Sequence, residues 1–173
     1  MDDLAVADYT AFVEAQWSPL FRTAYLLTGD YQLAEDLLQT TFTKVLLSWP
    51  RISRLGQPGA YARRMMTNQA TSWWRRRSSS ELPATEFPDR GTPGHEDSVT
   101  QSVVMWKALA TLAPRQRAVV VLRYYEDLSE AEIAETLGIA TGTVKSHCSA
   151  ALSRLTIEIE KQDHDLLMNG GPA

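Results

Sequence analysis

The amino-acid sequence predicts an all-α protein made of two small helical domains joined by a flexible linker. Between Tyr31 and Trp49, apolar residues recur every three or four positions, which is the spacing of one buried stripe on a helix. Between Ser129 and Gly138, a capping box and a terminal glycine delimit a second, short helix. β-Branched residues do not gather in alternating runs, so we expect no strand.

The first domain, residues 1–78, is expected to begin with two consecutive helices. One starts at Ser18-Pro19, with serine as N-cap and proline at the first helical position, and ends at Gly29. The next is capped by Asp30 and stopped by Pro50. Its apolar stripe consists of Ala34, Leu38, Phe42, Val45 and Trp49.

A third helix is expected from Pro58 to about Arg77. Residues 79–98 follow as an acidic linker rich in serine, proline and glycine, which cannot bury enough apolar surface to fold alone. The second domain then covers residues 99–160, and residues 161–173 are expected to be a disordered tail.

Composition narrows the possible functions. The chain has 173 residues, and its single cysteine, Cys148, excludes an internal disulfide and a cysteine-based zinc site. No apolar run is long enough for a membrane span and the N-terminus is acidic, so a cytoplasmic protein without membrane association is expected. The net charge is −4, but residues 60–80 carry five arginines and no acid, which indicates a surface for phosphates.

The segment from about Leu112 to Leu155 predicts a helix-turn-helix unit that can enter a DNA groove. A helix begins at Pro114 and ends near Glu126. The next begins with the capping box of Ser129 and Glu132 and ends at Gly138.

A longer helix follows from about Gly142, and its two faces differ. Its inward positions are apolar or small: Val144, Cys148, either Ala151 or Leu152, and Leu155. Its outward positions are short and polar: Thr143, Lys145, Ser146, Ser149 and Ser153. Short donors near the start of a helix, with packing residues behind them, are typical of a recognition helix. The alternative is an ordinary helical hairpin with a polar outer face.

The segment from Tyr61 to Arg77 combines arginines with two tryptophans. One helical face carries Arg64, Asn68, Thr71, Ser72 and Arg75. Arginines that bind phosphates beside aromatic side chains are typical of a surface that holds melted or single-stranded DNA. Two alternatives stay open: Trp73 aligns with Met66 and Ala62 and can be a core residue, and the arginines can be a solvated helix end.

Four segments together resemble an extracytoplasmic-function (group IV) sigma factor of bacterial RNA polymerase, particularly the small actinobacterial type. The segments are Tyr25–Asp30, Ala34–Gln39, Thr71–Arg77 and Pro114–Ser146. They occur in the family's order and at its spacing, and the resemblance covers about residues 8–157. It implies a region 2 helical bundle, a region 4 helix-turn-helix and a connecting linker that threads toward the polymerase active-site cleft.

The resemblance also implies roles for individual residues. Docking to the polymerase clamp (β′) falls to Glu35, Asp36 and Gln39, and the β flap is a second contact of the core enzyme. Recognition and melting of the −10 element fall to Arg63, Arg64, Asn68, Thr71, Ser72, Trp74, Arg75, Arg76 and Arg77. Readout of the −35 element falls to Thr143, Lys145, Ser146, His147, Ser149 and Arg154. Asn68 lies where the family often places a base-contacting residue, and residues 78–81 would wall the pocket for a flipped base.

Ala150 and Cys148 are two positions of the helix-turn-helix with open roles. Family members often carry an arginine where this chain has Ala150, so the −35 contact is expected to be weaker or to depend on Lys145, Ser146 and DNA shape. Arg154 can compensate toward the DNA backbone. Cys148 is expected to be a small buried residue, with a redox role as the alternative.

The expected action is therefore non-covalent. The chain has no P-loop, dinucleotide fingerprint, HExxH or G-x-S-x-G motif, so enzyme chemistry is excluded and no cofactor or metal is expected. The partners are core RNA polymerase, double-stranded and melted promoter DNA, and an anti-sigma factor that is plausible for the family. The remaining alternative is a conventional helix-turn-helix regulator that is not a polymerase subunit.

Overall fold

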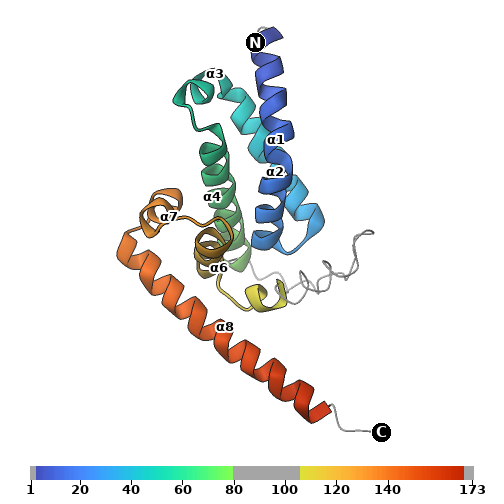
Figure 1. Cartoon of the computed structure of the whole chain (residues 1–173), viewed down its shortest axis with the longest axis vertical. Coiled ribbons are helices and arrows are strands. Elements are labelled where there is room, and N and C mark those ends of the chain that lie inside the picture. The colour runs from blue at the N-terminus through green and yellow to red at the C-terminus, as the bar shows by residue number, and fades with distance from the viewer. Residues whose placement is uncertain (1–2, 80–105, 170–173) are drawn as a thin grey trace.

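The structure, a computed structural model, describes the backbone of residues 3–79 and 106–169 and the side chains of residues 3–73 and 106–161. Within these ranges the chain is helical and contains no strand, which confirms the predicted all-α class (Figure 1). The predicted linker, residues 79–98, lies outside the described residues except for residue 79.

The first helical unit consists of residues 3–79. Its elements are α1 (Asp3–Thr28), α2 (Tyr31–Leu47), α3 (Trp49–Ile52), the 3₁₀ turn η1 (Ser53–Leu55) and α4 (Pro58–Ser79). Gly29 adopts a φ of +72° and donates its N–H to Tyr25 O at 2.7 Å, which ends α1 at the predicted residue. Asp30 Oδ1 accepts from the N–H of Leu33 at 2.8 Å and caps α2, also as predicted.

The first helix begins earlier than predicted, because α1 runs through Ser18-Pro19 instead of starting there. A proline inside a helix lacks the N–H that would bond to the residue four positions before it, at a cost of about 3 kcal/mol. Burial of Leu20, Ala24 and Leu27 on the next turns offsets this cost. Local propensity predicted a helix start, and packing against α2 overrides it.

The predicted apolar stripe of α2 is confirmed. Its five residues are no more than 5% exposed: Ala34, Leu38, Phe42, Val45 and Trp49. Tyr9 and Phe12 of α1 surround the Trp49 ring, with ring centroids 5.2 and 4.9 Å away. The helix ends at Leu47 rather than Trp49, and Pro50 lies within the short α3 because proline is tolerated in the first turn of a helix.

The second helical unit consists of residues 106–169. A helical turn at 106–110 precedes α6 (Pro114–Val120), the π-helical turn η2 (Val121–Tyr125), α7 (Glu130–Leu137) and α8 (Thr141–Asn169). The capping box is confirmed, because Ser129 Oγ accepts from the N–H of Glu132 while a Glu132 carboxylate oxygen accepts from the N–H of Ser129. Gly138 ends α7 in the left-handed conformation, with a φ of +63°.

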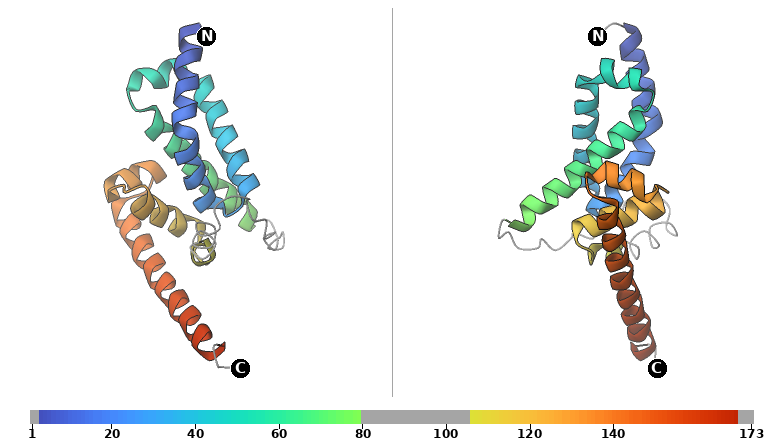
Figure 2. Two further views of the ribbon diagram at one scale, coloured as in Figure 1. Left: turned by 45° about the vertical axis from the view of Figure 1, so that its right-hand side comes forward. Right: turned by 90° about the vertical axis from the view of Figure 1, so that its left-hand side faces the viewer.

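The last helix is longer than predicted. A disordered tail was expected from residue 161, but α8 continues to Asn169. No proline or glycine stands between Gly142 and Gly170, so nothing in the sequence breaks the helix before that point. Residues 170–173 lie outside the described residues. Both turned views show α8 projecting away from the first unit (Figure 2).

The two units pack against each other through α1, α4, α6 and α7. At one end of the contact, the buried Arg117 of α6 donates across the interface to Leu27 O at 2.9 Å. It also donates to the carbonyls of Leu109, Ala110 and Leu112 in its own unit, and its guanidinium lies 4.7 Å from the Trp106 ring centroid. Burial lowers the pKa of Arg117 to about 10, so the side chain remains charged at neutral pH.

Candidate nucleic-acid interface

One candidate surface lies along α4 and is called the α4 surface here. Its described side chains are those of Arg63, Arg64, Asn68, Thr71 and Ser72. Arg64 is exposed and the other four are half-buried. The remaining predicted −10 residues, Trp74 and Arg75 to Arg77, continue α4, and their side chains lie outside the described residues.

An open pocket of about 440 Å³ lies beside this surface, between α2 and α4. It is lined by Lys44, Tyr61, Arg64, Met65, Asn68, Gln69 and Ser72. Lys44 Nζ donates to Gln69 Oε1 at 2.7 Å, which joins the two helices at the pocket wall. The lining combines two cations, amides, a hydroxyl and one aromatic ring, and carries no carboxylate. Amides and a hydroxyl can bind the polar edge of a flat ligand, and the two cations can bind a negatively charged group attached to it.

The inner side of α4 explains where the tryptophan-containing segment is anchored. Ala62, Met66 and Ala70 are buried against α1 and α2, whereas Trp73 at the end of this row is half-buried. Trp73 therefore follows the core row that the sequence indicated, at the edge of the packed region.

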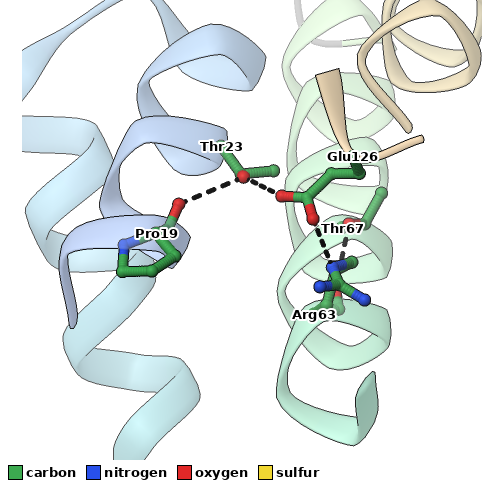
Figure 3. A network of polar contacts seen from close by, with 5 residues as sticks. All are labelled: Pro19, Thr23, Arg63, Thr67 and Glu126. Carbon is green, nitrogen blue, oxygen red and sulfur yellow. Dashed lines mark hydrogen bonds and ion pairs between the residues drawn. The ribbon is translucent and has the colours of Figure 1, made fainter. Parts of the chain in front are cut away.

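The second unit covers part of the α4 surface. Glu126, the residue that follows η2, reaches between α1 and α4, and its Oε2 lies 2.7 Å from Arg63 Nε (Figure 3). Its Oε1 accepts a hydrogen bond from the Thr23 hydroxyl of α1. The side chains of Arg63 and Glu126 are 26% and 11% exposed, so this ion pair is partly shielded from water.

Two further contacts come from α7. Asn68 Nδ2 donates to the backbone carbonyl of Thr136 at 2.8 Å, and Arg64 lies 3.1 Å from Glu135 Oε1. The pair of Arg64 and Glu135 is largely exposed, so it contributes little by itself. Three of the predicted −10 residues thus have partners in the second unit, which the sequence analysis did not anticipate.

A second candidate surface, called the α8 surface here, lies on the first turns of α8. Lys145, Ser146, Ser149 and Arg154 are exposed, and Thr143 and His147 are half-buried, so the predicted −35 residues lie on an accessible part of the helix. Lys145 Nζ lies 3.6 Å from Glu130 of α7, an exposed pair.

The inward face of α8 resolves an alternative that the sequence left open. Val144 and Ala151 are buried, whereas Leu152 is 41% exposed, so Ala151 is the packing residue. Ala150 is exposed on the outer side. Cys148 is only half-buried, and its Sγ lies 3.8 Å from the Tyr124 hydroxyl. This contact raises the pKa of Tyr124, chiefly through the hydrogen bond with Cys148.

The predicted polymerase-docking residues lie on the outer side of α2. Asp36 and Gln39 are exposed and Glu35 is half-buried, and Gln39 Nε2 lies 3.5 Å from Glu35 Oε1. Together they form a polar, acidic strip opposite the buried stripe of the same helix.

Sequence reasoning missed Glu126 and Arg117, the residues that join the two units. Each stood in the segment Pro114–Ser146, which was interpreted as part of the helix-turn-helix and of the family resemblance but not as a contact between the two units. A buried arginine with no nearby acid in the sequence gives no pattern of its own, because its partners are backbone carbonyls. The π-helical turn that positions Glu126 likewise has no recognisable pattern in the sequence.

The described residues hold no group of three or more histidine, cysteine, aspartate or glutamate side chains that could hold a metal ion. Among the described helices, none combines the length and apolar character needed to cross a bilayer.

Comparison with known families matches both units. The family description "Sigma-70 region 2" matches residues 12–80, and "Sigma-70, region 4" matches residues 102–155. The two matches correspond to the first helical unit and to most of the second.

Individual relatives give the same result. The chain is 38% identical over 160 residues to the RNA polymerase sigma-E factor of Streptomyces avermitilis, covering 92% of this chain and 89% of that protein. It is 33% identical over 149 residues to the ECF RNA polymerase sigma factor SigL of Mycobacterium tuberculosis, covering 80% of this chain and 82% of that protein.

A solved structure shares the fold. It is the sigma factor RpoE of Bartonella quintana in complex with the anti-sigma factor NepR, with a TM-score of 0.67 and 23% identity, covering 88% of this chain and 97% of that one.

Proposed function

Because the chain belongs to the extracytoplasmic-function (ECF) RNA polymerase sigma factors, we propose that its α4 and α8 surfaces are two DNA-binding surfaces that contact one promoter together. A sigma factor is a non-enzymatic specificity subunit, so the residues act by binding. The α4 surface holds the melted −10 element and the α8 surface reads the −35 element in duplex DNA. Core RNA polymerase sets the distance between them, and each contact raises the effective concentration of the other.

The observation that carries the −10 assignment is the open, acid-free pocket beside Asn68. A base that leaves the duplex needs a cavity with polar groups for its edge and cations for its phosphates. The pocket offers the Asn68 and Gln69 amides for the base edge, and Arg64 and Lys44 for phosphate. The arginines at 75–77 continue the same helix and extend the charge along the DNA strand.

The −35 assignment depends on the exposed start of α8. Lys145, Ser146 and Ser149 present short donors at the N-terminal end of the helix, where a recognition helix contacts base edges. The exposed side chain of Ala150 supplies no hydrogen bond, so the contact of the α8 surface with the −35 element is expected to be the weaker of the two.

Docking to the polymerase clamp is proposed for Glu35, Asp36 and Gln39 on α2, with the β flap as the partner of the second unit. The acidic strip is on the outer side of its helix, where a rigid partner can reach it. Since the Bartonella quintana protein was solved with an anti-sigma factor, we include such a regulator among the proposed partners. We propose that the chain acts in the cytoplasm, where core polymerase acts.

Reconstituted transcription tests the proposal. The purified chain is mixed with core polymerase, and initiation is measured from a promoter selected for this chain. The triple variant R75A/R76A/R77A is expected to weaken open-complex formation and to flatten its salt dependence, because fewer counterions are released when fewer phosphates are neutralised. The matched control R51A/R54A/R115A removes the same charge from exposed positions elsewhere.

Unchanged open-complex formation in the first variant would contradict the −10 assignment. Tight and specific DNA binding by the chain without polymerase would instead favour a conventional helix-turn-helix regulator.

A further inference from the structure

The surface proposed to hold melted DNA is the surface that the second unit covers. Arg63 faces Glu126, Arg64 faces Glu135, and Asn68 donates to Thr136 O. Three of the groups proposed to bind a phosphate or a base edge therefore already have an oxygen partner from the second unit.

Glu126 is held in place by the backbone around it. Its N–H donates to Val121 O at 3.1 Å, a five-residue step that belongs to the π-helical turn η2. The next residue, Asp127, has a φ of +53°, in the left-handed region that non-glycine residues rarely adopt. The chain therefore turns sharply at the point where the Glu126 carboxylate enters the space between α1 and α4 (Figure 3).

We infer that Glu126 locks the two units into a closed state in which Arg63 and Asn68 of the α4 surface are unavailable to DNA, while the pocket beside them stays open. The Glu126 carboxylate gives Arg63 the kind of oxygen that a DNA phosphate would give it, so the two compete for one guanidinium. The Thr136 carbonyl competes in the same way for the Asn68 amide. The inference rests on the proposed function of α4, and it adds that binding of melted DNA requires the units to separate.

Glu126 is the contact on which closure depends most. Its carboxylate is 11% exposed and touches two elements of the first unit, α1 through Thr23 and α4 through Arg63. The pair of Arg64 and Glu135 is exposed and screened by water. Among the described ion pairs, Arg63 with Glu126 and Arg64 with Glu135 connect the two units.

A distance measurement without DNA tests closure itself. Spin labels are attached at Thr43 of α2 and Ser153 of α8, both exposed, in a chain carrying Cys148→Ser, and the distance distribution is measured by pulsed electron resonance. The parent chain is expected to give one narrow distribution. E126Q keeps the size of the side chain but removes its charge, and it is expected to add a population at a different distance. The control E160Q removes an exposed charge from α8 and is expected to match the parent.

A binding measurement then tests whether closure limits DNA access. The probe is a fluorescein-labelled single-stranded DNA of random sequence, followed by anisotropy. E126Q is expected to bind about tenfold more tightly than E160Q, because the apparent dissociation constant falls as the open fraction rises. E135K is expected to bind this DNA about threefold more tightly than its control E160K. The effect is smaller than that of E126Q because the pair of Glu135 and Arg64 is exposed.

Three results would overturn the inference. One is a distance distribution in E126Q that matches E160Q. Another is a parent chain that is already broadly distributed. The third is opening of E126Q with no gain in DNA binding over its control. These outcomes are separate from failure of the proposed function, which would appear as no initiation by the parent chain with core polymerase.

Discussion

The α4 and α8 surfaces differ in how the chain presents them. The described part of the α4 surface has partners from the second unit at Arg63, Arg64 and Asn68, whereas the α8 surface combines short polar side chains with Lys145 and Arg154 and has no such described cover. Each surface has two cations among its described side chains, and the two on α4 are those that face carboxylates of the other unit. Charge alone therefore does not identify the surface that is free to bind a promoter, since an intramolecular carboxylate can occupy a cationic side chain.

The largest expected effect comes from the joint between the units. Arg117→Ala removes a buried cation that donates to four backbone carbonyls, and each carbonyl left without a donor is costly. We expect a loss of about 3 kcal/mol in unfolding free energy, measured by urea denaturation. Arg117→Lys retains the charge but not the fork of donors, so it is expected to recover only part of the loss. A loss below that of an exposed variant such as Arg115→Ala would contradict this account.

A glycine at the same joint gives the next effect. Gly29 has a left-handed φ, and a Cβ there would overlap the indole ring of Trp106. Gly29→Ala is expected to cost about 2 kcal/mol and to displace Trp106, with a change in tryptophan fluorescence. Gly56→Ala is the matched control, because Gly56 has nearly the same φ and open space around its Cβ position. Equal effects of the two substitutions would show that Trp106 does not dock as described.

The open surface is tested by adding charge to it. Ala150→Arg places a guanidinium on the exposed outer side of α8, and we expect promoter binding by the reconstituted polymerase to strengthen by about 1.5 kcal/mol. The slope of log affinity against log salt should steepen by about one unit. The spin-label distance should stay unchanged, because Ala150 is exposed on the outer side of α8 and has no described contact with Glu126. Arginine at Ile157, further along the exposed helix, serves as the control for non-specific charge.

The smallest effect concerns the helix that supplies Glu135 and Thr136. Ser129→Ala removes the N-cap of α7 and is expected to lower the unfolding free energy by about 1 kcal/mol at neutral pH. The hydrogen bonds from Ser129 hold the pKa of Glu132 below its usual value. Because the pKa of Glu132 is lower in the folded than in the unfolded chain, its carboxylate stabilises the fold when the pH is above the unfolded pKa. This stability is lost as the pH falls through the lowered, folded pKa.

The difference in thermal stability between the parent and Ser129→Ala should therefore shrink on acidification. A difference that is constant from neutral to acidic pH would show that Glu132 does not take part in the cap.

Much of the fold could be predicted from the sequence because its signals are local. The Asp30 cap, the stripe of α2, the capping box and the two glycine stops involve residues within a few positions of each other. The start of α1 could not be predicted, because Pro19 is tolerated only through burial against another helix. The end of α8 was predicted too early, although no proline or glycine stands between Gly142 and Gly170 to break the helix.

The candidate site divides in the same way. The arginines of α4 and the short polar residues of α8 could be assigned from spacing and family resemblance. The covering of α4 could not, because Arg63 and Glu126 stand 63 positions apart and nothing local pairs them. Whether Ala151 or Leu152 faces the core was also open, since both fit a helical period.

The division of hydrogen bonds at Arg117 has a consequence for how the units come apart. Of its four hydrogen bonds described above, those to Leu109, Ala110 and Leu112 stay inside the second unit, and the bond to Leu27 crosses to α1. Separation therefore breaks the described bond to Leu27, while the three described bonds inside the second unit stay in place. Arg117 can therefore support the second unit in the same way whether the two units are in contact or apart.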